Sequence, residues 1–263
     1  MENKKYKIVL IGAGNVATQL GLALIKAKHK ILQVVSLHPS SAEELATKLK
    51  CKFTTYPEKI NLSADIYIIA VNDKAIEKVV RNLKLENQII VHTSGTTNIK
   101  ALQNTSDNFG VFYPLQTFSK EREIDFSTIP ILLETSNQKT YEVLKSIAKS
   151  ITNGEVIVAD SKERMKIHLA AVFANNFTNH LYGIARNIIS KDNFDFDMFG
   201  PLIEETIRKI ENDSPEDMQT GPAVRGDKKT MNAHLKLLSK NKDYQTIYKL
   251  LSKSIIKSSK KNK

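Results

Sequence analysis

The chain has 263 residues, of which 41% are apolar, and a formal net charge of +11. A chain of this length can bury a substantial core without covalent help, and its single cysteine, Cys51, excludes an intramolecular disulfide. No apolar run approaches the roughly 18 residues that a membrane-spanning helix needs. Six of the lysines lie in the acid-free segment 249–263, so the charge does not form the basic face that nucleic-acid binding requires.

Short apolar strands alternate with amphipathic helices over the first 159 residues. Strands are predicted at residues 6–11, 31–37, 51–54, 65–71, 88–92, 109–113, 129–134 and 155–158. Helices are predicted at residues 15–28, 41–50, 73–82, 98–104 and 138–151. This alternation is typical of the α/β class and predicts a Rossmann-type doubly wound, mostly parallel sheet with helices on both faces.

Helical periodicity dominates the remaining residues. Helices are predicted at 160–189, 196–212 and 230–258, with a loop at 213–227. We therefore expect a nucleotide-binding domain at 1–159 and an all-helical domain for substrate binding and dimerisation at 160–263. Because helices 196–212 and 234–256 carry more apolar residues than one partner face can bury, we expect a homodimer.

The location of the protein is predicted from the same features. A lone cysteine without an adjoining histidine or basic cluster favours an inert thiol in a reducing compartment. We expect no signal peptide, because the apolar run 8–11 is interrupted at once by Gly12 and Gly14. The expectation is a cytoplasmic protein that binds neither membrane nor nucleic acid.

A glycine-rich motif follows the first predicted strand and opens the first predicted helix. Residues 12–17 read GAGNVA and fit G-x-G-x-x-A. Gly12 permits a tight turn, Gly14 lets the backbone approach a pyrophosphate, and Asn15 and Val16 lie in the helix turn that faces it. A glycine turn with a purely structural role is the alternative.

The end of the second predicted strand indicates which dinucleotide is bound. A carboxylate there bonds the ribose 2′-OH of NAD, whereas residues 32–42 contain no acid. Ser36, His38 and Ser40 offer hydroxyls and an imidazole to a 2′-phosphate instead. The sequence favours NADP, although the same residues also suit a turn and a helix cap.

Polar clusters follow the next two predicted strands, at the sheet edge where ligands of open α/β sheets bind. We expect them to hold the ribose and nicotinamide of the cofactor: Val71, Asn72, Asp73, Thr93, Ser94 and Gly95. Helix capping is the alternative for Asn72 and Asp73, and a satisfied buried histidine is the alternative for His92. The aromatic segment 112–118, which includes Tyr113, suits either a pocket wall or plain packing.

Candidate catalytic residues lie on the first long helix of the C-terminal half. His168 is the candidate proton donor, because an imidazole can give up a proton near neutral pH, and Asn175 or Asn176 would orient the substrate. At about 100° per residue, Asn175 falls within roughly 20° of His168. A solvated or interface stripe is the alternative.

The loop 220–227 interrupts the helical half. Gly221, Pro222 and Gly226 force a non-helical path, and Arg225 offers a planar donor fork for an anion. We expect this loop to contribute to the active site, with a surface connector as the alternative. No residue set suggests a metal site.

Several of these motifs together resemble a bacterial family of predicted NADP oxidoreductases, in which a Rossmann-like half precedes a helical domain of unknown function. The motifs are residues 12–17, 70–73, 92–95, 112–116, the helix around His168 and Asn176, and 220–227. At greater distance the layout is similar to pyrroline-5-carboxylate reductase, ketopantoate reductase and the β-hydroxyacid dehydrogenases. The β-hydroxyacid dehydrogenases carry a Lys-x-x-x-Asn pair on the corresponding helix. In this chain only the asparagine has a counterpart, so the substrates of those enzymes are not assigned to it.

The resemblance and the motifs imply an enzyme that moves hydride between NADP(H) and a small carbonyl, imine or alcohol substrate. The alternative is a non-catalytic NADP(H)-responsive binding or regulatory protein.

Overall fold

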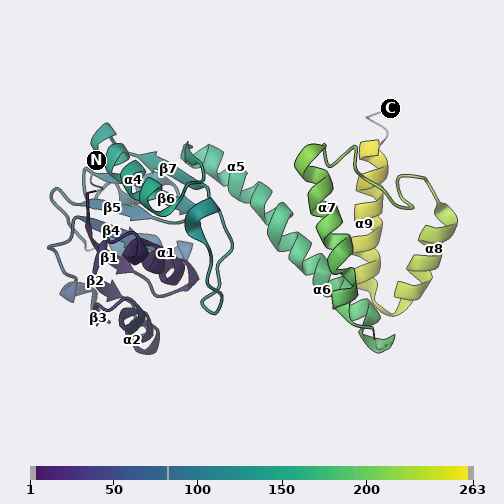
Figure 1. Cartoon of the computed structure of the whole chain (residues 1–263), viewed down its shortest axis with the longest axis horizontal. Helices are drawn as coiled ribbons and strands as arrows, with labels where there is room; N and C mark the ends of the chain where they lie inside the picture. Colours follow the sequence, from purple (N-terminus) through teal and green to yellow (C-terminus); the bar gives the residue numbers. More distant parts are fainter. Residues whose placement is uncertain (1–3, 82, 193, 260–263) are drawn as a thin grey trace. The chain divides into compact units, whose positions relative to one another are not determined.

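A computed structural model describes residues 4–81, 83–192 and 194–259 of the chain. The chain divides into two compact units, residues 1–176 and 177–263 (Figure 1). The predicted boundary after residue 159 lies two residues before helix α5 (Ser161–Ala171), which belongs to the first unit. The functional extent of each domain stays a prediction.

The first unit is built on an eight-stranded sheet in the order β3-β2-β1-β4-β5-β6-β7-β8. Its strands are β1 (Lys7–Ile11), β2 (Lys30–Val35), β3 (Lys52–Thr54), β4 (Ile66–Ile69), β5 (Ile89–His92), β6 (Phe109–Pro114), β7 (Ile131–Thr135) and β8 (Val156–Val158). Every neighbouring pair is parallel except β6 with β7. The predicted Rossmann-type, mostly parallel sheet is confirmed.

Helices cover both faces of this sheet. They are α1 (Asn15–Lys26), α2 (Pro39–Lys48), α3 (Asp73–Val80) and α4 (Gln138–Ile151), together with the 3₁₀ helices η1 (Pro57–Lys59), η2 (Ile99–Leu102) and η3 (Phe126–Thr128). The predicted helix 98–104 is therefore a single 3₁₀ segment, which Asn98 caps by accepting from the Lys100 N–H. Residue 82, the predicted end of α3, lies outside the described residues.

Strand alternation explains the two cores. Ile8 and Leu10 of β1 pack into one apolar cluster with α1, α2 and α4, whereas Val9 and Ile11 pack into a second cluster with α3 and η2. Helices α1, α2 and α4 are the ones drawn over the sheet in Figure 1. Because β1, β2, β4, β5 and β6 run parallel, their carboxyl ends meet at one edge, where the loops that follow them gather.

The helical unit contains α6 (Thr178–Ile189), α7 (Gly200–Asn212), α8 (Lys228–Leu237) and α9 (Lys242–Ser259), with 3₁₀ helices η5 (Ser190–Asp192), η6 (Phe196–Phe199) and η7 (Leu238–Lys240). The predicted helix 230–258 is broken in two, because Asn241 leaves the helical path and its side chain accepts from the Tyr244 N–H. Within the described part of this unit, Ala223 alone is buried. None of the described helices is long and apolar enough to cross a bilayer.

Candidate active site

The glycine-rich turn joins β1 to α1 with little freedom at its first residue. Gly12 has φ +117°, and a Cβ there would stand 2.2 Å from the carbonyl oxygen of Ala70, so no other residue fits. Around Gly14, by contrast, no heavy atom lies within 4 Å of where a Cβ would stand. No side chain caps the N-terminus of α1. The turn therefore fits a pyrophosphate: it offers backbone N–H groups, a positive helix end and open space.

The first turn of α1 also holds a distant loop. Asn15 donates from Nδ2 to the carbonyl of Phe118 at 2.8 Å, and Gln19 donates to the carbonyls of Ser119 and Arg122 at 2.7 and 2.9 Å. The Asn15 side chain is thus occupied by the loop between β6 and β7. Its backbone N–H is the group that remains for a phosphate.

The predicted 2′-phosphate residues lie at the end of β2 and the start of α2. Ser36 is half-buried and its hydroxyl accepts from the His38 N–H at 3.3 Å, whereas His38 and Ser40 are exposed. Helix α2 has no side-chain cap and no acid in its first turn. Hydroxyls, an imidazole and an uncapped helix end therefore surround this position, and they favour an anion over a ribose hydroxyl.

The polar residues after β4 and β5 join two loops to each other. Asn72 caps α3 by accepting from the Lys74 N–H at 3.2 Å, as its alternative interpretation requires. Asp73 accepts from the Thr96 hydroxyl at 2.6 Å. Ser94 accepts from the backbone N–H groups of Thr96 and Thr97 at 3.1 and 2.9 Å. These side chains shape the sheet edge, so contact with a ligand would fall mainly to the backbone.

Three further predicted positions line the same edge. Val71 is half-buried, while Thr93 and Gly95 are buried. The Thr93 hydroxyl donates to the carbonyl of Ile69 at 3.4 Å.

His92 at the end of β5 is fully buried. Its Nδ1 accepts from the Ser94 N–H at 3.2 Å. Burial lowers the pKa of His92 to about 4, and the positive charge of Arg164 acts in the same direction. A ring that stays neutral at pH 7 holds the loop in place and is not a proton donor there.

Tyr113 and His168 meet above this loop. The Tyr113 hydroxyl lies 3.0 Å from His168 Nδ1, and the two rings meet edge to face with centroids 6.1 Å apart. Burial raises the pKa of Tyr113, an effect that Arg164 reduces. A Cβ on Gly95 would stand 2.6 Å from His168 Nδ1, so glycine is what allows the imidazole to lie against the loop. Sequence alone left Tyr113 between a pocket wall and packing; the structure gives it a polar partner.

Asn175 and Asn176 do not follow the predicted spacing. They lie in the π-helical segment Val172–Phe177 (η4), where each residue turns less than in an α-helix, and both side chains are exposed. The assumption of about 100° per residue from His168 to Asn175 is therefore wrong. The structure pairs His168 with Tyr113 and leaves the two asparagines on an exposed surface.

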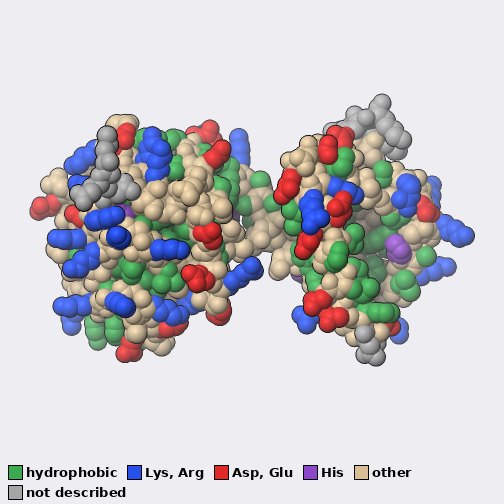
Figure 2. Space-filling model, viewed as in Figure 1, with side chains coloured by type: hydrophobic (Ala, Val, Ile, Leu, Met, Phe, Trp, Pro, Cys, Tyr) green, Lys and Arg blue, Asp and Glu red, His purple; other side chains and the backbone are tan. Residues whose placement is uncertain are grey.

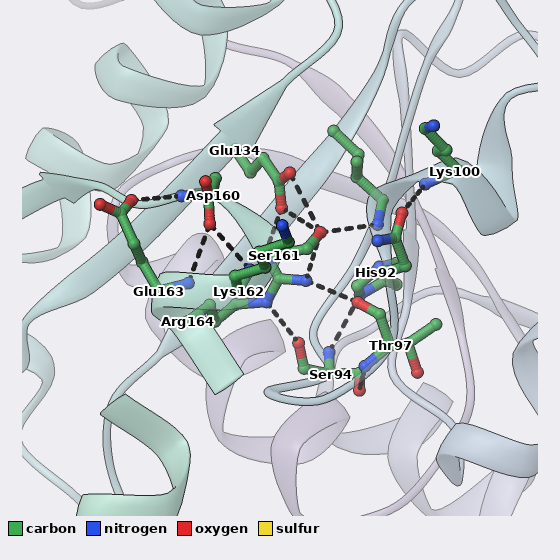
Figure 3. A network of polar contacts seen from close by, with 12 residues as sticks. His92, Ser94, Thr97, Lys100, Glu134, Asp160, Ser161, Lys162, Glu163 and Arg164 are labelled. Carbon is green, nitrogen blue, oxygen red and sulfur yellow. Dashed lines mark hydrogen bonds and ion pairs between the residues drawn. The ribbon is translucent and has the colours of Figure 1, made fainter. Parts of the chain in front are cut away.

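A buried ion pair that the sequence did not reveal underlies this region (Figure 3). Arg164 of α5 pairs with Glu134 of β7 and donates to the carbonyls of Ser94 and Thr97. The two charges are 30 residues apart, so no local spacing connects them. The one available signal was an arginine one helical turn before His168, on the same face of the helix.

The loop 220–227 lies in the helical unit, where Gly221 and Gly226 have positive φ and Asp227 caps α8. Over the described residues, no group of three or more His, Cys, Asp or Glu side chains is placed to hold a metal ion.

The strand order, the glycine-rich turn and the uncapped α1 define a Rossmann-type dinucleotide-binding protein. Family models agree: one described as NADP oxidoreductase coenzyme F420-dependent matches residues 7–95, and one described as a domain of unknown function, DUF2520, matches residues 129–255. A search of curated proteins found no match.

Solved structures extend the likeness to the whole chain. A Bacteroides fragilis protein provisionally named as an NADP oxidoreductase is 42% identical, with a TM-score of 0.91 over 96% of this chain and 98% of that one. An Aspergillus terreus reductive aminase in complex with NADPH is 11% identical, with a TM-score of 0.71 over 97% and 94%. A Streptococcus pyogenes 1-pyrroline-5-carboxylate reductase is 15% identical, with a TM-score of 0.66 over 97% and 99%. The last two show the fold alone.

The identity to the Bacteroides fragilis protein shows that the chain belongs to its family of NADP oxidoreductases. The predicted family, the enzyme class and NADP as cofactor are thereby confirmed.

Proposed function

We propose that the chain transfers hydride between NADP(H) and a small carbonyl, imine or alcohol substrate, and that His168 and Tyr113 supply the proton. The observation that carries this proposal is the 3.0 Å contact between the Tyr113 hydroxyl and His168 Nδ1, above the loop that follows β5. When bound, the nicotinamide supplies or accepts the hydride. The protein's task is then to move one proton at the substrate oxygen or nitrogen.

The pair suits proton transfer in either direction. In its protonated form, His168 donates through Nδ1 to the Tyr113 oxygen, which leaves the phenol proton free for the substrate heteroatom. Reduction then adds hydride to carbon and this proton to oxygen or nitrogen, and the tyrosine recovers a proton from His168. Oxidation of an alcohol or amine reverses each step. Asn175 and Asn176 remain our candidates for orienting the substrate.

Turnover of NADPH tests the proposal. Purified protein should consume NADPH with at least one member of a panel of ketoacids, aldehydes and imines; imines are included because a reductive aminase shares this fold. His168→Ala and Tyr113→Phe should each lower turnover about 100-fold or more while NADPH still binds. NADPH binding without turnover over the whole panel would favour the non-catalytic alternative.

The proposed cofactor site consists of the turn residues Gly12, Gly14, Asn15 and Val16, the 2′-phosphate residues Ser36, His38 and Ser40, and the edge residues Val71, Asn72, Asp73, Thr93, Ser94 and Gly95. Calorimetric titration should show tighter binding of NADP than of NAD. Ser36→Asp should reverse that order, because a carboxylate repels the 2′-phosphate and accepts from a 2′-OH. Equal affinities in the unchanged protein would contradict this assignment.

We also propose a homodimer formed through the helical unit. Its described residues leave large apolar side chains exposed, among them Leu202, Leu237 and Leu250, and such surfaces mark interaction sites. Light scattering at micromolar concentration should give twice the mass of one chain. Leu202→Glu should give a monomer, whereas the control Gln103→Glu, at an exposed position of the first unit, should not. A monomeric unchanged protein would contradict the proposal.

We also propose a cytoplasmic location, which a lone cysteine with an unreactive thiol supports. Burial raises the pKa of the Cys51 thiol to about 11, which keeps it protonated and unreactive at neutral pH. Fractionation of cells that express the protein would test the location.

A further inference from the structure

Among the residues that the structure describes, Arg164 has the largest fully buried side chain, although most of its neighbours on α5 are exposed. A guanidinium cannot lose its proton, so its burial is tolerated only where acceptors replace water. Those acceptors are the carboxylate of Glu134, the carbonyls of Ser94 and Thr97, and the hydroxyl of Ser161.

The acceptors come from separate parts of the first unit (Figure 3). Glu134 lies near the carboxyl end of β7, and Ser94 and Thr97 belong to the loop after β5. Ser161 in the first turn of α5 donates to both Glu134 oxygens, at 3.0 and 2.8 Å, and accepts from the Ile99 N–H at 3.1 Å. Sheet, loop and helix are thus held together by one set of polar contacts.

This set of contacts fixes where His168 lies. Arg164 and His168 are four residues apart on α5, so they lie on the same face of the helix. Gly95, against which the imidazole lies, stands between the two residues whose carbonyls Arg164 holds. Moving the helix would therefore separate His168 from Tyr113 of β6, and moving the loop would remove the surface at Gly95 against which the imidazole lies.

We propose that Arg164, with Glu134 as its counter-ion, is a positioning residue. It holds the loop after β5 and helix α5 in fixed relative positions, so that His168 contacts Tyr113 at the sheet edge proposed to bind the cofactor. This inference rests on the function proposed above for the pair and the loop. If the Arg164–Glu134 ion pair only stabilised the fold, its loss would affect folding but would leave the Tyr113–His168 contact and the loop after β5 unchanged.

Arg164→Lys is the first test variant. Lysine keeps the positive charge beside Glu134, but one ammonium group cannot also reach both loop carbonyls. We expect a folded protein whose NADPH dissociation constant rises about tenfold, which corresponds to the loss of about one hydrogen bond made by a charged group. We also expect the imidazole resonances of His168 in ¹H–¹⁵N spectra to resemble those of Tyr113→Phe, which lacks the hydroxyl partner.

A second variant covers the case in which Arg164→Lys does not fold. Arg164→Met combined with Glu134→Gln removes both buried charges at once, a change that often preserves stability. It should fold and show the same loss of NADPH affinity and the same His168 spectrum. The matched control is Arg208→Met with Glu204→Gln, an exposed Arg–Glu pair on α7, which should change neither measurement.

The two proposals fail in different ways. If the unchanged protein neither binds NADPH nor turns it over, the proposed function fails, while the His168 spectrum still tests the positioning. If a folded Arg164 variant keeps both its NADPH affinity and the His168 spectrum of the unchanged protein, Arg164 is not a positioning residue.

Discussion

The two units contain the same pairs of side chains in different surroundings. Arg164 and Glu134 in the first unit have side-chain exposures of 1% and 15%, whereas Arg208 and Glu204 in the helical unit have exposures of 70% and 69%. Each unit also has a tyrosine hydroxyl on a histidine Nδ1, Tyr113 with His168 at 3.0 Å and Tyr248 with His234 at 2.9 Å. Residue types alone do not make a site.

Burial separates the two Arg–Glu pairs, whereas the four residues of the two Tyr–His pairs are all half-buried. An exposed Arg–Glu pair on a helix contributes about 0.3–0.5 kcal/mol, because water screens it. A buried pair has lost its water, so each partner depends on the other and on the surrounding carbonyls. The first unit places its pairs beside two apolar cores, whereas the described residues of the helical unit contain Ala223 as their single buried side chain. Hydrophobic side chains, green in Figure 2, accordingly reach the visible surface of the helical unit.

Truncating one leucine in each unit tests this comparison most strongly. Leu20→Ala in the core of the first unit should lower the free energy of unfolding by about 2–5 kcal/mol at any protein concentration. Leu202→Ala should lower it by about 2 kcal/mol if the homodimer buries this side chain, and the loss should depend on protein concentration. Denaturation at several concentrations measures both. A loss below about 0.5 kcal/mol for Leu202→Ala would mean that this leucine stays exposed in solution.

The two glycines of the nucleotide turn should differ sharply. Gly12→Ala places a Cβ against the Ala70 carbonyl at a positive φ and should lower the free energy of unfolding by about 3 kcal/mol. Gly14→Ala meets no atom and should leave unfolding unchanged, while NADPH affinity falls because the methyl group occupies the space for the pyrophosphate. Thermal melts and NADPH titrations separate the two effects. Unchanged NADPH affinity in Gly14→Ala would argue against a pyrophosphate at this turn.

The fold of the first unit was predictable because its signals are local. Apolar runs bounded by glycine or polar residues located all eight strands, and helix 138–151 was predicted with the bounds that the structure gives α4. In the helical half, the sequence did not predict where the regular α-helical turn is interrupted. The π-helical segment 172–177 and the break at Asn241 depend on a few backbone bonds that leave no periodic signal.

The candidate site was predictable only in part for the same reason. The turn at Gly12 and Gly14 carries its chemistry in a short motif. The contacts of Arg164 with Glu134, and of Tyr113 with His168, join residues 30 and 55 positions apart, so they follow from the fold and from no spacing. Helix capping by Asn72 was one of the two interpretations that the sequence left open, whereas the backbone partners of Ser94 emerged only from the structure.

Acid should weaken the first unit through His92. Its folded pKa of about 4 lies below the ordinary histidine pKa of about 6.5, so the contribution of the neutral ring to stability is complete only above pH 6.5. As the pH falls toward about 4, the unfolded chain binds a proton at this histidine, whereas the buried ring of the folded chain does not. The free energy of unfolding therefore falls by roughly 2–3 kcal/mol. His92→Asn should flatten this part of the profile, whereas His180→Asn, at an exposed position of the helical unit, should not. Urea unfolding at a series of pH values tests the slope. An unchanged slope in His92→Asn would assign the acid sensitivity to other groups, such as the partly buried His29, whose pKa burial also lowers.

Removing the hydroxyl from either Tyr–His pair gives the smallest expected change in stability. Tyr113→Phe and Tyr248→Phe each remove one hydroxyl from a histidine, and each should lower the free energy of unfolding by about 1 kcal/mol. With a substrate in hand, Tyr113→Phe should lower turnover about 100-fold and change its pH profile, because His168 loses the hydroxyl that passes its proton on. Tyr248→Phe should leave turnover and its pH profile unchanged, since neither Tyr248 nor His234 belongs to the proposed active site. Equal turnover in the two variants would mean that the Tyr113 hydroxyl is not needed for turnover, and His168 would then have to act without it.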